Sequence, residues 1–285
     1  MSRTIPPPAS TERARRIGAA ATTVGATVLA VLIAVFVLGP LVWLGVQAFA
    51  GHWTFPRLLP DSWTLSWWHE VLADANLGSS IRLSLILSPV VTAVSMLICL
   101  PAAYAFARMP FRGRRALLIA IFATNAFPRF GLFIAMSSLF YALNLMGTAV
   151  GVVIVQLIGT IVFMTWIPAA AFASVPPSLE EAARDAGAGP LRVFLRVTLP
   201  IAAPAILVAI ILSFLAAFDE AQGTFLVGAP EYITMPTEMY NLIGHYPGQV
   251  SAVFSILLSI PSVVLMLLVR RHVLSGTVAE GFQLR

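Results

Sequence analysis

The sequence of 285 residues contains no lysine, one cysteine and few charged side chains of any kind. Charged residues make up 10% of the chain and hydrophobic ones 59%, whereas an ordinary soluble domain is about 25% charged. A water-soluble fold has no interior large enough to cover that much apolar surface. The composition therefore excludes an ordinary soluble domain and predicts an all-α protein that lies in a lipid bilayer.

The missing lysine also excludes one kind of nucleotide site. A phosphate-binding P-loop needs the lysine of its G-x-x-x-x-G-K-[ST] motif, so this chain does not hold ATP in the usual way. We expect no cofactor in this chain, and any ATP and Mg²⁺ are expected on a partner. The histidines lack partners at ligand spacing, which predicts no metal site. Without a His-Glu-x-x-His or Gly-x-Ser-x-Gly motif, no enzyme activity is predicted.

The hydrophobic residues are gathered in long runs. A run of about 20 residues matches the roughly 30 Å hydrocarbon core of a bilayer. Six such runs divide the chain into an N-terminal tail (1–17), a membrane domain (18–272) and a C-terminal tail (273–285), with both ends on the same side. The expected membrane spans are 18–48, 83–107, 116–133, 150–171, 202–218 and 250–269.

The arginines indicate the orientation of these spans. Of the 17 arginines, 14 precede the first span or follow the second, fourth and sixth spans, which all end on the same side of the membrane. Basic residues are enriched in cytoplasmic loops, so both termini are expected in the cytoplasm. The basic residues are dispersed between apolar spans rather than gathered on a polar domain, and we therefore expect no nucleic-acid partner. The 14 residues are Arg3, Arg13, Arg15, Arg16, Arg108, Arg112, Arg114, Arg115, Arg184, Arg192, Arg196, Arg270, Arg271 and Arg285.

The connection between the fourth and fifth spans, residues 178–200, contains the most informative pattern. Ser178-x-x-Glu181 fits a capping box, which predicts a helix that begins near Leu179. Alanines follow within this helix, and Gly187 is expected to end it. Gly189-Pro190 then opens a second short helix. Small side chains let another surface approach closely, so this coupling loop (178–200) is predicted to dock a protein.

A family resemblance rests on this loop. Glu181-Ala182-Ala183, three residues, Gly187, nine residues and Val197-x-Leu199-Pro200 resemble the EAA loop of permease subunits in binding-protein-dependent ABC importers, with valine where isoleucine is commoner. The resemblance implies a type I ABC importer permease fold, in which the loop is a cytoplasmic coupling helix that enters a cleft on the ATPase. The residues implied to couple to the ATPase are Glu181, Ala182, Ala183, Asp185 and Gly187.

The same resemblance implies the partners and the location. Such importers combine a heterodimer of two permease subunits with two ATPase subunits and an external solute-binding protein, in the inner membrane of a bacterium. A stand-alone channel or secondary transporter is the alternative class. It predicts transport without an ATPase and gives no reason for the spacing of the EAA loop.

Two solute classes stay open at this point. The length, Ala102-Ala-Tyr-Ala-Phe-Ala-Arg108, Val175-Pro176 and the segment 270–281 resemble the maltose-type sugar permeases, which favours a carbohydrate or sugar derivative. Phe218-Asp219-Glu220, with Thr234-Met-Pro236 and Met239-Tyr240, instead resembles polyamine permeases. Carboxylates in or near a membrane are costly and are therefore candidates for function. The candidate residues of the solute pathway are Asn125, Asp219, Glu220, Tyr240 and Asn241.

Overall fold

The computed structural model describes residues 9–54 and 57–274, which contain helices and no named strand. The chain divides into two compact units, Met1–Trp67 and Trp68–Arg285. Parts of both predicted tails, residues 1–8 and 275–285, lie outside the described residues. In the first unit, α1 (Ala9–Phe49) begins before the predicted span, and its apolar part, Thr23–Phe49, is long enough to cross a membrane.

The segment after α1 is folded by its tryptophans. The Trp67 indole donates a hydrogen bond to the Ala50 carbonyl oxygen (2.8 Å), and the Trp53 indole donates one to the Arg57 carbonyl (2.8 Å). The Trp43 and Trp53 rings lie 4.7 Å apart. The short helix α2 (Ser66–Ala73) follows, and the two units divide within it, between Trp67 and Trp68.

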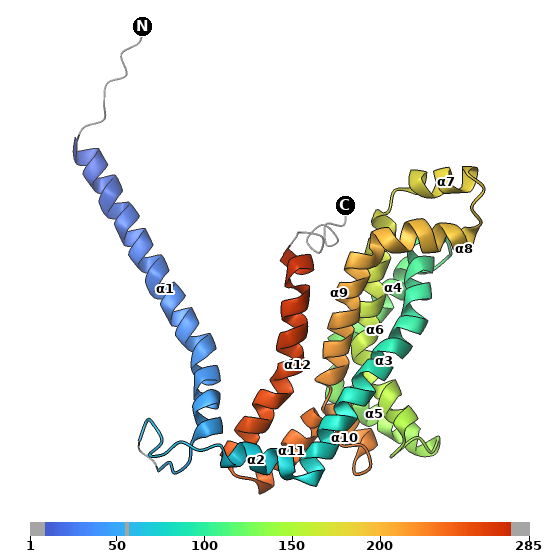
Figure 1. Cartoon of the computed structure of the whole chain (residues 1–285). Helices are drawn as coiled ribbons and strands as arrows, with labels where there is room; N and C mark the ends of the chain where they lie inside the picture. Colours follow the sequence, from blue (N-terminus) through green and yellow to red (C-terminus); the bar gives the residue numbers. More distant parts are fainter. Residues whose placement is uncertain (1–8, 55–56, 275–285) are drawn as a thin grey trace. The chain divides into compact units, whose positions relative to one another are not determined.

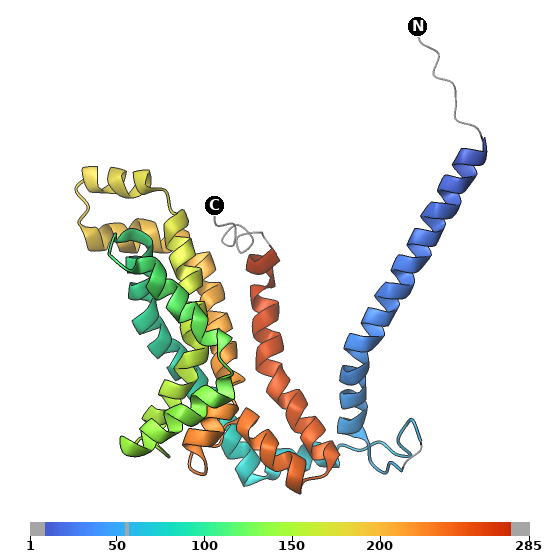
Figure 2. The ribbon, with the colours of Figure 1, turned by 180° about the vertical axis from the view of Figure 1, so that it is seen from behind.

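The core of the second unit is a bundle of three long helices. These are α3 (Ala75–Arg108), α6 (Ala149–Ser174) and α9 (Leu199–Phe218), which run side by side in Figures 1 and 2. Asp74 caps α3 by accepting hydrogen bonds from two backbone N–H groups, and the Thr148 hydroxyl caps α6 by accepting one from the Gly151 N–H. The last helix, α12 (Gly248–Leu274), contacts α9 and α11 (Met235–His245).

The predicted span 116–133 is shorter than the segment in the structure, which is broken before Pro128. The structure instead has α4 (Arg114–Ala123), the 3-10 turn η1 (Thr124–Ala126) and α5 (Arg129–Ala142), and the chain bends by 103° at the break. Pro128 disfavours the helical conformation at the residue before it, and Phe127 accordingly adopts extended dihedrals. Among the described residues, five helices can each cross a membrane, and the bent pair brings the number to six. The expectation of about six spans is confirmed in this form.

Short helices lie at the two ends of the bundle. One end holds α7 (Pro177–Asp185), α8 (Pro190–Val193) and the π-helical turn η2 (Phe194–Thr198), which leads directly into α9. The other end holds α10 (Gln222–Gly228) and α11, together with α5 (Figure 1). The coupling loop and the polar segments after α9 therefore lie at opposite ends of the bundle.

Candidate functional site

The coupling loop begins with a helix whose start differs from the expectation. α7 begins at Pro177, with Pro176 at the N-cap and no side-chain hydrogen bond to the cap. The predicted capping box of Ser178 and Glu181 is therefore wrong. Proline has the backbone angle of a first helical residue and lacks the N–H that a cap would satisfy, so the two prolines start the helix before Ser178 can cap it.

The end of this helix is as expected. Gly187 has φ +85°, a left-handed conformation that favours glycine. Its N–H donates to the Arg184 carbonyl (2.8 Å), and the Ala188 N–H donates to the Ala183 carbonyl (3.0 Å). Gly189 then precedes Pro190, the first residue of α8.

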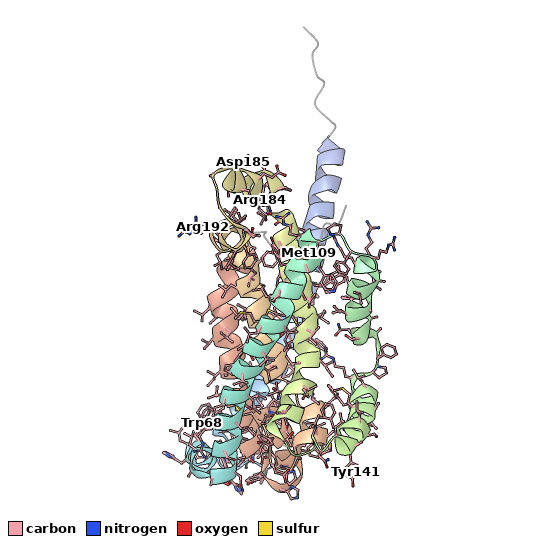
Figure 3. All side chains as sticks on the ribbon, turned by 90° about the vertical axis from the view of Figure 1, so that its right-hand side faces the viewer. Trp68, Met109, Tyr141, Arg184, Asp185 and Arg192 are labelled. Atoms are coloured by element: carbon pink, nitrogen blue, oxygen red, sulfur yellow. The ribbon has the colours of Figure 1, made fainter. Side chains whose placement is uncertain are left out.

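The residues implied to couple to the ATPase lie on the surface. Glu181, Ala182, Asp185 and Gly187 are exposed, and Ala183 is half-buried. Figure 3 shows Asp185, Arg184 and Arg192 at one end of the bundle, opposite Tyr141. Among the apolar residues of this end, Leu179, Leu191 and Leu195 are 46%, 70% and 51% exposed. Small, charged and apolar side chains are thus all exposed within the coupling loop, and exposed apolar groups of this kind mark protein interaction sites.

The preceding glutamate is buried, and the sequence did not single it out. Glu180 is 4% exposed, and its carboxylate binds Arg108 of α3 (2.9 Å) and Arg184 of α7 (3.3 Å). Thr198 of η2 also donates a hydrogen bond to this carboxylate (2.8 Å). In the sequence, Glu180 and Glu181 are adjacent and chemically the same, so only the packing distinguishes them.

The two carboxylates after α9 have different surroundings. Glu220 is buried and caps α10, because it accepts hydrogen bonds from the N–H groups of Gly223 and Thr224 (2.8 Å each) and from the Thr224 hydroxyl (2.7 Å). Gln156 of α6 donates to the same hydroxyl (3.0 Å). Asp219, in contrast, is exposed at the end of α9. The pair does not form a single dicarboxylate site.

Helix α11 lies beside this segment and carries two of the other candidates. The Thr237 hydroxyl donates to the Ala221 carbonyl (3.4 Å), and the ring of exposed Tyr240 lies 5.5 Å from the Phe225 ring of α10. Asn241 donates to the carboxylate of Glu238 (3.1 Å), a residue that sequence reasoning missed. Burial raises the pKa of Glu238, and the nearby charge of Asp74 adds to this shift, while the Asn241 hydrogen bond opposes it.

The remaining candidate, Asn125, is separate from these residues in its contacts. It is exposed in η1, donates to the Phe122 carbonyl (3.4 Å) and accepts from Arg129 (3.4 Å). These bonds stay within the break between α4 and α5. The structure therefore connects the segments of Asp219, Glu220, Tyr240 and Asn241, and leaves Asn125 on another part of the surface.

A comparison with known families identifies the chain. Residues 95–275 match the family described as the binding-protein-dependent transport system inner membrane component. The chain belongs to this family of ABC permeases. The matched region includes the coupling loop and the helices α4 to α12 in full.

Individual relatives of this permease cover most of its length. The trehalose/maltose transport system permease protein MalG of Thermococcus litoralis is 29% identical over 89% of this chain and 94% of its own length. The maltodextrin transport system permease protein MdxG of Bacillus subtilis is 30% identical over 82% of each chain. Among solved structures, a bacterial ABC transporter involved in alginate import has a similar fold, with a TM-score of 0.67 at 22% identity over 94% of this chain and 99% of that one.

The different surroundings of the adjacent carboxylates in this permease lead to a prediction. Glu220→Gln replaces a charged acceptor of three hydrogen bonds and is expected to lower the free energy of unfolding by about 1–3 kcal/mol. Asp219→Asn alters an exposed side chain and is the matched control, with an expected change within about 0.5 kcal/mol. Denaturant unfolding in detergent measures both, and an equal loss in the two variants would contradict the assignment of Glu220 as a cap.

Proposed function

We propose that this chain is the membrane permease subunit of an ATP-driven importer that moves a carbohydrate or sugar derivative. The observation that carries the proposal is the coupling loop, whose EAA residues are exposed on α7 and its following turn at one end of the bundle. The match to the binding-protein-dependent family supports the same assignment.

The proposed assembly contains a second permease subunit, two ATPase subunits and an external solute-binding protein. The ATPase subunits bind ATP and Mg²⁺ and cover the exposed surface of α7, so that hydrolysis moves this helix. The arginine distribution supports a cytoplasmic position for the coupling loop and both termini, in a bacterial inner membrane. The external binding protein delivers solute at the opposite end, where α10 and α11 lie.

Relatives and local geometry both favour a sugar over a polyamine. Several relatives are described as permeases for maltose, maltodextrin or trehalose. A polyamine site would need carboxylates that face the ligand together, and Glu220 uses both of its oxygens to cap α10. The neutral hydrogen-bonding groups of Tyr240 and Asn241 suit hydroxyls. We assign them and exposed Asp219 to the solute pathway, and Asn125 remains a further candidate.

The proposal is tested by ATPase activity of the purified complex in lipid nanodiscs, with its binding protein and a panel of sugars, polyols and polyamines. Stimulation by a sugar is the expected result. Stimulation by polyamines alone would replace the sugar with a cation as solute. Uptake into vesicles by this chain without any ATPase would instead support the stand-alone transporter and overturn the proposed function.

A further inference from the structure

A buried ion pair attaches the coupling helix α7 to the membrane-spanning bundle. Glu180, on the inner face of α7, lies 2.9 Å from the guanidinium of Arg108, the last residue of α3. The two side chains are 5% and 16% exposed and are separated by 72 residues in the chain. The contact joins α3 and α7, which are separated in the sequence by α4, α5 and α6.

The same two side chains also reach the other helices at this end. The Arg108 guanidinium donates to the carbonyl of Val175 (2.8 Å), the C-cap residue of α6. The Glu180 oxygen that binds Arg108 also accepts the hydroxyl hydrogen of Thr198 (2.8 Å), a fully buried residue that directly precedes α9. The Glu180 cluster (Arg108, Val175, Glu180 and Thr198) therefore holds the ends of α3, α6 and α9 against α7.

Stability alone does not explain why charges are used here. A buried ion pair loses so much hydration that well-packed apolar side chains often stabilise a protein equally well. What the charged pair adds is direction, since a charge-assisted hydrogen bond holds its two groups within a narrow range of distance and angle. Without it, α7 is a helix of nine residues that is connected to α6 and α8 by short turns.

We propose that Glu180 and Arg108 are a positioning pair that transmits displacement of α7 to α3 and α9 together. The inference rests on the proposed function of α7 as the helix that docks the ATPase. The ATPase acts on the exposed face, which carries Glu181 and Asp185, while Glu180 on the inner face moves the bundle. Loss of the pair then leaves docking intact and lets α7 move without its spans.

The test uses the whole reconstituted importer with Glu180→Gln, Arg108→Gln and the double variant. Arg112→Gln, which removes an exposed arginine from the loop after α3, is the matched control. We expect normal ATPase copurification in all four, and a fall of about fivefold or more in solute moved per ATP hydrolysed in the first three. Because the two residues act as one unit, the double variant is expected to be no worse than the poorer single variant.

A second measurement does not depend on the ATPase. Spin labels at Ser178→Cys on α7 and Met109→Cys after α3 report the distance between the two helices in the permease alone, and Glu180→Gln is expected to broaden its distribution. If the distance distribution and the amount of solute moved per ATP hydrolysed both match those of the Arg112→Gln control, the positioning role is wrong. If no ATPase copurifies with the unsubstituted permease, the proposed function is wrong. The distance distribution still tests the positioning role of Glu180 and Arg108, because it is measured on the permease alone.

If the single variants assemble poorly, a further variant still tests the proposal. Arg108→Met with Glu180→Leu removes both charges together and leaves no unpaired ion in the interior. This variant is expected to assemble and to remain uncoupled, because its apolar contact has no fixed hydrogen-bond geometry. If the apolar variant moves a normal amount of solute per ATP hydrolysed, the proposal is overturned.

Discussion

Replacing Gly187 with valine is expected to reduce ATP-driven uptake about tenfold or more while the spans stay inserted in the membrane. Gly187 has φ +85°, where a β-branched side chain is strained by about 1–3 kcal/mol. Open space surrounds the position, so the strain comes from the backbone and not from a clash. The turn is expected to relax by moving α8 and the end of α7, which displaces the docking surface.

Gly189→Val is the matched control for this variant. Gly189 lies in the same turn with the same open surroundings, but its φ is −68°, which any residue adopts. Uptake and ATPase copurification should therefore stay close to normal. The assignment of α7 as the docking helix would be wrong if Gly187→Val retained both normal uptake and normal copurification.

Gly151→Ala is expected to have the largest effect on folding, with a loss of about 3 kcal/mol in the free energy of unfolding. An added Cβ would fall on the carbonyl oxygen of Leu145 and 3.1 Å from the side chain of Val227. The carbonyl cannot move freely, because it also accepts the Thr148 hydroxyl (2.7 Å) at the start of α6. The substitution therefore forces the first turn of α6 away from the turn that follows α5.

Gly159→Ala provides the control on the same helix. Its new Cβ would meet only Ala216, at 3.7 and 3.8 Å, which is ordinary van der Waals contact. Alanine also favours a helix over glycine by up to about 1 kcal/mol, so this variant should be neutral or slightly stabilising. Thermal unfolding of the two variants in the same detergent measures the difference, and an unchanged midpoint for Gly151→Ala would contradict the packing at Leu145.

The length of the hydrophobic runs allowed most of the fold to be predicted from the sequence. A bilayer requires about 20 apolar residues in each helix, and that requirement acts on local sequence alone, so the long helices and their order were predictable. The spacing of the EAA loop likewise indicated the family. The bounds of the third span, predicted as 116–133, were too short because the apolar segment continues to Ala142 beyond the 103° bend at Pro128.

The features of the candidate functional site also divide into those that the sequence predicted and those that it did not. The exposure of Glu181, Asp185 and Gly187 could be anticipated from a loop pattern that suits a docking surface. The split between Asp219 and Glu220 could not, because it depends on α10 beginning directly after them and needing a cap. The start of α7 was missed since two prolines replaced the side-chain cap that Ser178 was expected to provide.

By itself, the sequence determined that this protein spans a membrane several times, that it lacks the lysine of a P-loop and that its coupling loop has the EAA spacing. Only the tertiary structure decided which of two adjacent glutamates is buried. Glu180 is buried because Arg108, 72 residues earlier, and Thr198, 18 residues later, converge on it when α3, α7 and α9 pack together. Local composition determines the free energy of transferring each segment out of water. The partners that offset a buried charge, in contrast, come from segments distant in the chain.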